Sequence, residues 1–194
     1  NGRARIDVQQ NLALRWVRTD ELKDVFQALK GLGLNASGKH TITDIVTCPG
    51  TDSCKLGITS SMGLNQALRD TLANYDTSDE LINQIHIKAS GCPNSCGQHH
   101  IANIGFHGAV MKGPGGQVPA YELFLGGEYE DRVKMGTRVR ARVPAKKAPE
   151  VLVTLLDFYK ANRNEGEKFN AFVDRQDTGV FEAMIGEFKD VGPL

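Results

Sequence analysis

Two short loops contain all four cysteines of the chain. Cys48 and Cys54 form a C-x5-C pair within TCPGTDSC, and Cys92 and Cys96 form a C-x3-C pair within SGCPNSCGQ. Two pairs of thiols can form disulfides, bind a structural zinc ion or hold an iron–sulfur cluster. The chemistry of this chain is therefore expected at these two loops.

Each cysteine loop follows a run of residues that is typical of a strand. Residues 43–46 precede the first loop and residues 85–89 precede the second. The prolines after Cys48 and Cys92 end these runs, because proline fixes φ and has no N–H for a continuing ladder. The pattern predicts two strands that deliver the thiol pairs from loops at their ends.

The spacing of the cysteines favours an iron–sulfur cluster. Disulfide frameworks are typical of small secreted domains with a poor core, whereas 40% of these 194 residues are hydrophobic. Zinc sites usually use tighter pairs, so the five-residue gap fits zinc less well. A [4Fe–4S] cluster takes four thiolates and accepts longer loops. Zinc, a redox disulfide and four unrelated buried cysteines remain alternatives on spacing alone.

The two cysteine motifs resemble the sirohaem and [4Fe–4S] signature of the nitrite/sulfite reductase haemoprotein family. The resemblance extends to QNLALRWV, HHIANIGFHG, YELFLGG and RNEGEKF. It implies that all four cysteines ligate the cluster, and that Cys96 also bridges to the iron of the sirohaem. The glycine after Cys96 would then let the large macrocycle approach the backbone.

The resemblance also implies a domain organisation. The family's haemoproteins are about two to three times longer, and each of their two pseudo-symmetric halves has half of a ferredoxin-like domain followed by a larger α/β domain. This chain resembles the C-terminal half, so the N-terminal half is an expected partner. We expect an α+β fold with α/β-like layers, in which residues 1–40 form the ferredoxin-like half-domain. Residues 41–194 would form the domain that binds sirohaem and [4Fe–4S].

The first 40 residues are expected to form one strand and one helix. Apolar residues partly alternate within residues 3–16, which favours a strand. From Leu22 to Leu29 they recur at helical spacing, after the capping residues Thr19 and Asp20. Without the rest of the ferredoxin-like domain, this part should expose an apolar sheet edge and helix face.

Strands and helices are also expected along residues 41–194. Ser60 and Ser61 can open a helix. Residues 101–110 and 121–125 are predicted strands, joined by a hairpin tip at the glycine-rich residues 113–116. Further helical segments are predicted at 79–84, 149–159, 169–175 and 179–188.

Three arginines, Arg138, Arg140 and Arg142, alternate along one predicted strand and therefore share a face. With Lys146 and Lys147 they form the one basic concentration in the sequence. Such a face is usually solvated, but it also suits the docking of an acidic electron donor such as a ferredoxin. Aromatic residues are not interleaved with the basic ones, so nucleic-acid binding is not expected.

Two adjacent histidines, His99 and His100, follow Cys96 closely. Neighbouring residues of a regular element point in different directions, so at most one should face a cofactor. The family motif requires no histidine ligand, and both are expected at the surface or in hydrogen bonds. No role is assigned to His40, His86 or His107.

Charge and hydropathy exclude some classes of function. The chain has 23 basic residues (Lys and Arg) and 23 acidic residues (Asp and Glu). This balance gives no overall electrostatic attraction to nucleic acid or to a membrane surface. No run of about 18 apolar residues is present, so no membrane span is expected. Reduced cysteines fit a cytoplasmic location.

The resemblance implies an oxidoreductase, the C-terminal part of an assimilatory-type sulfite or nitrite reductase. The implied reaction is the six-electron reduction of sulfite to sulfide, or of nitrite to ammonia, at a sirohaem joined through Cys96 to the cluster. The family's basic substrate-binding residues belong mostly to the other half, so this chain alone should not turn over either anion. The alternative is a module that binds only the cluster, for electron transfer or redox sensing. A zinc-stabilised structural domain is a third hypothesis.

Overall fold

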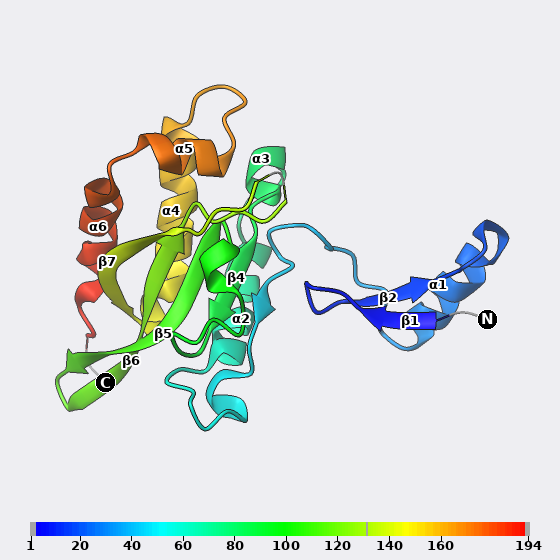
Figure 1. The fold of residues 1–194 in the computed structure, drawn as a ribbon, viewed down its shortest axis with the longest axis horizontal. Coiled ribbons are helices and arrows are strands. Elements are labelled where there is room, and N and C mark those ends of the chain that lie inside the picture. Colours follow the sequence, from blue (N-terminus) through cyan, green and yellow to red (C-terminus); the bar gives the residue numbers. More distant parts are fainter. Residues whose placement is uncertain (1–2, 131, 193–194) are drawn as a thin grey trace. The chain divides into compact units, whose positions relative to one another are not determined.

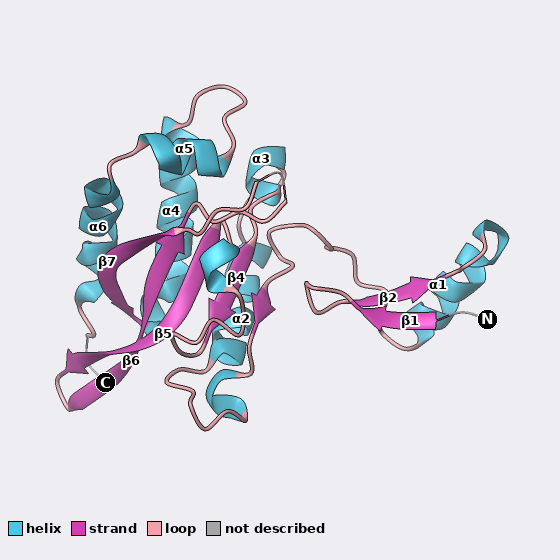
Figure 2. Ribbon diagram, in the orientation of Figure 1, coloured by secondary structure: helices cyan, strands magenta, loops and turns pink. Residues whose placement is uncertain are grey.

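The computed structural model describes residues 3–130 and 132–192. The chain divides into two compact units, residues 1–39 and residues 40–194. Figures 1 and 2 show strands and helices in both units. The expected mixture of α and β structure is confirmed.

The first unit consists of a two-stranded antiparallel sheet and one longer helix. β1 (Arg3–Ile6) pairs with β2 (Leu12–Arg15), and α1 (Leu22–Gly31) follows. The helix is confirmed. The prediction of a single strand over residues 3–16 is wrong, because the chain reverses between the two strands.

A tight turn at Asp7 divides the predicted strand. The Asp7 carboxylate accepts hydrogen bonds from the backbone N–H groups of Gln9 and Asn11, at 3.0 and 2.9 Å. Gln10 adopts the left-handed region with φ at +65°. An aspartate that binds the backbone two residues ahead mimics a backbone turn. The reversal has no glycine to mark it, which is why the alternating pattern was taken for one strand.

Apolar side chains remain at the surface of this first unit. No side chain of residues 3–39, all of which the structure describes, is buried. The large exposed apolar residues include Ile6, Leu12, Trp16, Phe26 and Leu32. The expectation of apolar faces exposed on both sheet and helix is confirmed.

The second unit is built on one five-stranded sheet in the order β3-β4-β5-β6-β7. The two strands that precede the cysteine loops, β3 and β4, run parallel to each other and to β5, whereas β5, β6 and β7 are antiparallel. The hairpin tip lies between β5 and β6, as predicted. The bounds are β3 (Val46–Thr47), β4 (Ile87–Ser90), β5 (Ile104–Gly113), β6 (Gly116–Leu125) and β7 (Thr137–Pro144).

Five α-helices of this unit lie where helical segments were predicted. The Ser60 hydroxyl caps the first of them by accepting the N–H of Gly63 at 3.1 Å. None of the described helices is long and apolar enough to cross a membrane. The helices are α2 (Ser61–Ala73), α3 (Glu80–Asn83), α4 (Ala148–Asn162), α5 (Phe169–Arg175) and α6 (Thr178–Gly186).

The main hydrophobic core lies between one face of this sheet and the helices (Figure 1). Phe106 of β5 and Leu123 of β6 belong to this core. Because successive strand residues point to opposite faces, His107 and Glu122 lie on the other face. Each is nevertheless buried. This second face therefore holds polar groups away from water.

Candidate functional site

The two cysteine loops begin side by side because β3 and β4 are parallel neighbours. Thr47 pairs with Ala89 in this ladder, and the N–H of Cys48 donates to the carbonyl of Ala89 at 3.2 Å. The carboxyl ends of neighbouring parallel strands lie at the same end of a sheet. Cys48, directly after β3, and Cys92, two residues after β4, therefore leave from one edge.

Hydrogen bonds tie the two loops to each other. The N–H of Gly91 donates to the Sγ atom of Cys48 at 3.1 Å. The carbonyl of the same glycine accepts the N–H groups of Ile58 and Thr59, at 2.8 and 3.0 Å. The second loop thus contacts both ends of the first, and residues 48–59 and 91–97 form one connected platform.

Gly97, the last residue of this platform, is packed against the backbone of β4 and of the first cysteine loop. A Cβ atom at Gly97 would lie 2.0 Å from the carbonyl oxygen of Ala89 and 3.1 Å from the backbone nitrogen of Cys48. No side chain fits there. The glycine after Cys96 thus has a packing function within the chain itself, in addition to the space that the family resemblance implies for a macrocycle.

The four thiols differ in their exposure. Cys48 and Cys92 are each 8% exposed, whereas Cys54 and Cys96 are exposed. All four are free, so the redox disulfide is not formed in this structure. Two sulfurs are held within the protein and two are available at its surface.

The spacing of the sulfur atoms differs from that of a zinc site. Among the described residues, which include every cysteine, no three sulfurs lie within 4.8 Å of one another. A tetrahedral zinc ion with bonds of about 2.3 Å holds its sulfurs about 3.8 Å apart. A cube of four irons and four sulfides keeps its thiolates further apart.

The environment of Cys48 stabilises its thiolate. Burial raises the pKa of the Cys48 thiol, but contacts with the Gly91 N–H, the Ser61 hydroxyl and the Gly50 N–H, at 3.1, 3.4 and 3.4 Å, bring the pKa below its ordinary value. The thiolate is the form that binds metals. Hydrogen bonds to sulfur also tune the reduction potential of an iron–sulfur cluster. Ser61 was not identified from the sequence, where it appeared only as a residue that opens a helix.

The rings of the two adjacent histidines lie next to each other. Their ring centroids lie 4.1 Å apart, and both rings contact Phe124. They belong to a short 3-10 turn (His99–Ile101) that follows Gln98 in the left-handed region, with φ at +61°. The rule that neighbours diverge applies to regular elements, and this turn is not one.

Hydrogen bonds connect both histidines to the second cysteine loop. The Nδ1 atoms of His99 and His100 lie 2.9 Å from the hydroxyls of Ser90 and Ser95. The expected hydrogen bonds are therefore confirmed, but His99 is fully buried rather than exposed. Burial, followed by the neighbouring His100 and His107, lowers the pKa of His99 to about 3, so this ring is neutral. Its Nε2 atom has no hydrogen-bond partner.

Two of the three arginines on β7 bind a single buried carboxylate. Arg138 and Arg142 donate from their Nε atoms to Glu122 at 2.6 and 2.7 Å. His107 lies 3.5 Å from the same carboxylate. Burial raises the pKa of Glu122, but the two guanidinium groups outweigh it and hold the pKa below its ordinary value. The basic face is thus partly neutralised by a residue on β6.

Replacing Glu122 with glutamine is expected to lower the free energy of unfolding by about 2 kcal/mol at neutral pH. A carboxylate whose pKa is depressed on folding stabilises the protein above its unfolded pKa, and this stability is lost as the pH falls through the folded value. The difference between wild type and Glu122→Gln should therefore shrink below about pH 4. Urea unfolding across pH measures it, with exposed Glu187→Gln as the control. A difference that does not change with pH would contradict the ion-pair explanation.

Residues 38–190 match the family described as "Nitrite and sulphite reductase 4Fe-4S domain". A sulfite reductase [ferredoxin] 2 of Mycolicibacterium paratuberculosis is 30% identical over 181 residues, covering 90% of this chain and 32% of the relative. An assimilatory ferredoxin-dependent nitrite reductase of Haloferax mediterranei is 30% identical over 132 residues, covering 68% of this chain and 22% of the relative. The chain thus spans about a third or less of the length of these relatives.

The solved structure of the Mycobacterium tuberculosis NirA protein has the same fold. It superposes with a TM-score of 0.78 at 24% sequence identity, and the match covers 92% of this chain and 33% of that one. Both units of the chain must contribute to a match of this extent. The similarity supports the fold assignment.

Proposed function

The chain belongs to the nitrite and sulphite reductase 4Fe-4S domain family, and we propose that it is the cluster-binding part of a sirohaem-dependent sulfite or nitrite reductase. One observation carries this proposal. All four cysteines lie within the residues that match the family, and the two loops that carry them begin at the neighbouring ends of β3 and β4.

The proposed ligands of the [4Fe–4S] cluster are Cys48, Cys54, Cys92 and Cys96. Four free thiols are the donor set that such a cluster requires. The N–H groups of Gly50 and Gly91 already point at the sulfur of Cys48 and would stabilise the charge on that ligand.

Cys96 is the proposed link to the sirohaem. Its side chain is exposed, so a group bound outside this unit can reach the sulfur. Cys54 is exposed as well, and the choice of Cys96 follows the family pattern, in which the last cysteine bridges. When bound, the sirohaem would supply the iron at which the anion is reduced. Serine and histidine side chains next to Cys96 hold its loop in place.

The proposed reaction reduces sulfite with six electrons and six protons to sulfide and three waters, or nitrite with six electrons and seven protons to ammonia and two waters. Two relatives are named for ferredoxin, which makes an acidic ferredoxin the proposed electron donor. Its docking near Arg138, Arg140 and Arg142 remains a proposal. Because Glu122 neutralises part of that face, Arg140 is the more important charge for such docking.

The domain assignment is part of the same proposal. Residues 1–40 would form a ferredoxin-like half-domain and residues 41–194 the cofactor-binding domain. The exposed apolar faces of the first unit support a missing structural partner for it, such as the N-terminal half of the family's haemoproteins. A cytoplasmic location is proposed from the four reduced thiols.

We expect the 194-residue chain to bind a cluster but not to reduce sulfite or nitrite. Without a water-excluded basic pocket, a charge pair at 4 Å is worth only about 1 kcal/mol, too little to hold the anion for catalysis. Anaerobic reconstitution with iron, sulfide and sirohaem, followed by assays of both anions with a low-potential reductant, tests this. A broad absorbance near about 400 nm reports the cluster, and zinc would give no colour.

Two results would contradict the proposal in different ways. A reconstituted chain that takes up no iron or sulfide would exclude the cluster. Turnover by the chain alone at a rate close to that of a complete reductase of this family would show that the catalytic residues lie within these 194 positions.

A further inference from the structure

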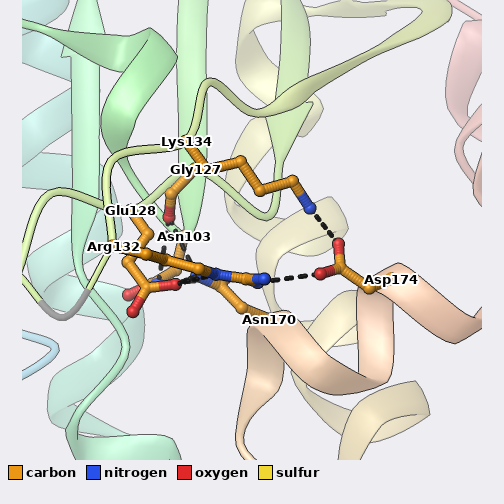
Figure 3. A network of polar contacts seen from close by, with 7 residues as sticks. All are labelled: Asn103, Gly127, Glu128, Arg132, Lys134, Asn170 and Asp174. Atoms are coloured by element: carbon orange, nitrogen blue, oxygen red, sulfur yellow. Dashed lines mark hydrogen bonds and ion pairs between the residues drawn. The ribbon is translucent and has the colours of Figure 1, made fainter.

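A cleft of about 1020 Å³ opens in the second unit, and its walls include residues from α3, α5 and the segment 128–132. Figure 3 shows how this segment is fixed: Arg132 extends between Glu128 and Asp174, with donor–acceptor distances of 2.8 Å to each. Lys134 binds the other oxygen of Asp174. These contacts join Arg132 and Lys134, from the loop after β6, to Asp174 of α5.

Three side chains with metal-ligating atoms meet at this cleft. One ligand atom from each of His40, His86 and Glu130 lies within 4.8 Å of those of the other two. All three line the cleft. They come from three separate parts of the sequence, and none of them belongs to the cysteine platform.

We propose that His40, His86 and Glu130 bind a divalent transition-metal ion of the zinc type. Two imidazoles and one carboxylate are an established ligand set for zinc, and such a site leaves a fourth position for water or another small ligand. Imidazole nitrogens disfavour magnesium and calcium, which prefer oxygen ligands. The open coordination position would face the cleft.

The surroundings of His86 prepare it for this role. The Tyr129 hydroxyl lies 3.1 Å from its Nδ1 atom, which leaves Nε2 for the metal. A hydrogen bond to the second ring nitrogen is the usual means of orienting a metal-bound histidine.

Charged groups of both signs surround His86. Glu130 and Asp44 both act electrostatically on His86, and Lys88 opposes them. The ammonium of Lys88 is directed elsewhere, 3.1 Å from the Gln98 side chain and 5.0 Å from the centre of the Tyr129 ring.

Only small movements are needed to complete the coordination. Metal–ligand bonds of about 2.0 Å place neighbouring donors about 3.3 Å apart, compared with the present limit of 4.8 Å. His40 and Glu130 are exposed and can rotate inward, whereas His86 is partly buried. The partly buried histidine would thus be the fixed point onto which the two exposed ligands close.

Cobalt(II) titration of the full chain tests this site separately from the cysteines. Thiolate-bound cobalt has an intense near-ultraviolet charge-transfer band, whereas a His–His–Glu site has only the weaker visible bands. We expect one equivalent of cobalt without the thiolate band. The affinity for this cobalt ion should fall at least about 100-fold in His86→Ala and about 10-fold in Tyr129→Phe. Glu187→Gln, which lies outside the cleft, should leave the affinity unchanged.

Circular dichroism establishes whether each variant is folded. If His86→Ala does not fold, the two exposed ligands are tested instead. His40→Ala and Glu130→Gln should each lower the affinity for the cobalt ion that binds without a thiolate band. The proposal is overturned if the wild-type chain binds cobalt only with the thiolate band. It is equally overturned if folded ligand variants bind the thiolate-free equivalent as tightly as the wild type.

Discussion

Replacement of Cys92 by serine is expected to abolish assembly of the iron–sulfur cluster in this chain. Cys92 is almost completely buried, next to the glycine that joins the two loops, so serine should fit the same space. A hydroxyl remains protonated and is a hard ligand, whereas iron–sulfur clusters require soft thiolates. Iron bound per chain after anaerobic reconstitution should fall from about four to below about one.

The matched control for this experiment is Ser53→Ala. Ser53 is exposed, lies in the first loop beside Cys54 and contributes no sulfur. This variant should retain the full iron content and the absorbance of the wild type. If Cys92→Ser retained the cluster, or if Ser53→Ala lost as much iron as Cys92→Ser, the four-cysteine site would be wrong. Circular dichroism separates loss of the ligand from loss of the fold.

The position of a strand end before each cysteine loop could be predicted because the signals there are local. The bounds of the first strand were wrong, because residues 42–45 form a turn and irregular backbone and β3 is only Val46–Thr47. A run of strand-forming residues followed by Cys-Pro marks the end of β3 and of β4, and the structure places Cys48 and Cys92 at those ends. The predicted hairpin tip between β5 and β6 is likewise a short glycine-rich signal. Local chemistry of this kind does not depend on which distant residues are neighbours.

Contacts between distant residues could not be predicted in the same way. Glu122 reaches Arg138 and Arg142 because β6 and β7 pair with a register shift between Glu122 and Leu123. Alternation along β7 suggested a shared face for the three arginines, and the structure brings Arg138 and Arg142 to one carboxylate that the alternation did not indicate. His86 and Glu130 lie 44 positions apart in the sequence, and only the folded chain brings them to one cleft.

The backbone conformation of single residues accounts for one error and for one arrangement that the sequence did not indicate. Gln10 and Gln98 both have positive φ without being glycine. The first lies in the turn that reverses the chain between β1 and β2, and the second precedes the turn that places His99 and His100 side by side. Non-glycine residues adopt this region rarely, so neither departure is visible in an alternating or helical pattern.

Gly97→Ala is expected to destabilise the second unit by about 3 kcal/mol or more, the upper part of the range for an overpacked site. Its Cβ atom would lie 2.0 Å from the Ala89 carbonyl oxygen, and the obstacle is backbone of β4 rather than a flexible side chain. Either the strand or the loop must move. The midpoint of thermal unfolding should fall by about 6–12 °C, and iron uptake should decrease because Cys96 moves with its neighbour.

Gly186→Ala is the matched control for this substitution. Gly186 ends α6, and a Cβ atom there would meet nothing within 4 Å. Alanine favours helix over glycine, so this variant should be unchanged or up to about 1 kcal/mol more stable. Thermal and urea unfolding of both variants, with iron uptake measured on the same samples, tests the comparison. A Gly97→Ala protein as stable as Gly186→Ala would show that the second cysteine loop is not held against β4, and that the platform beneath the four cysteines is not rigid.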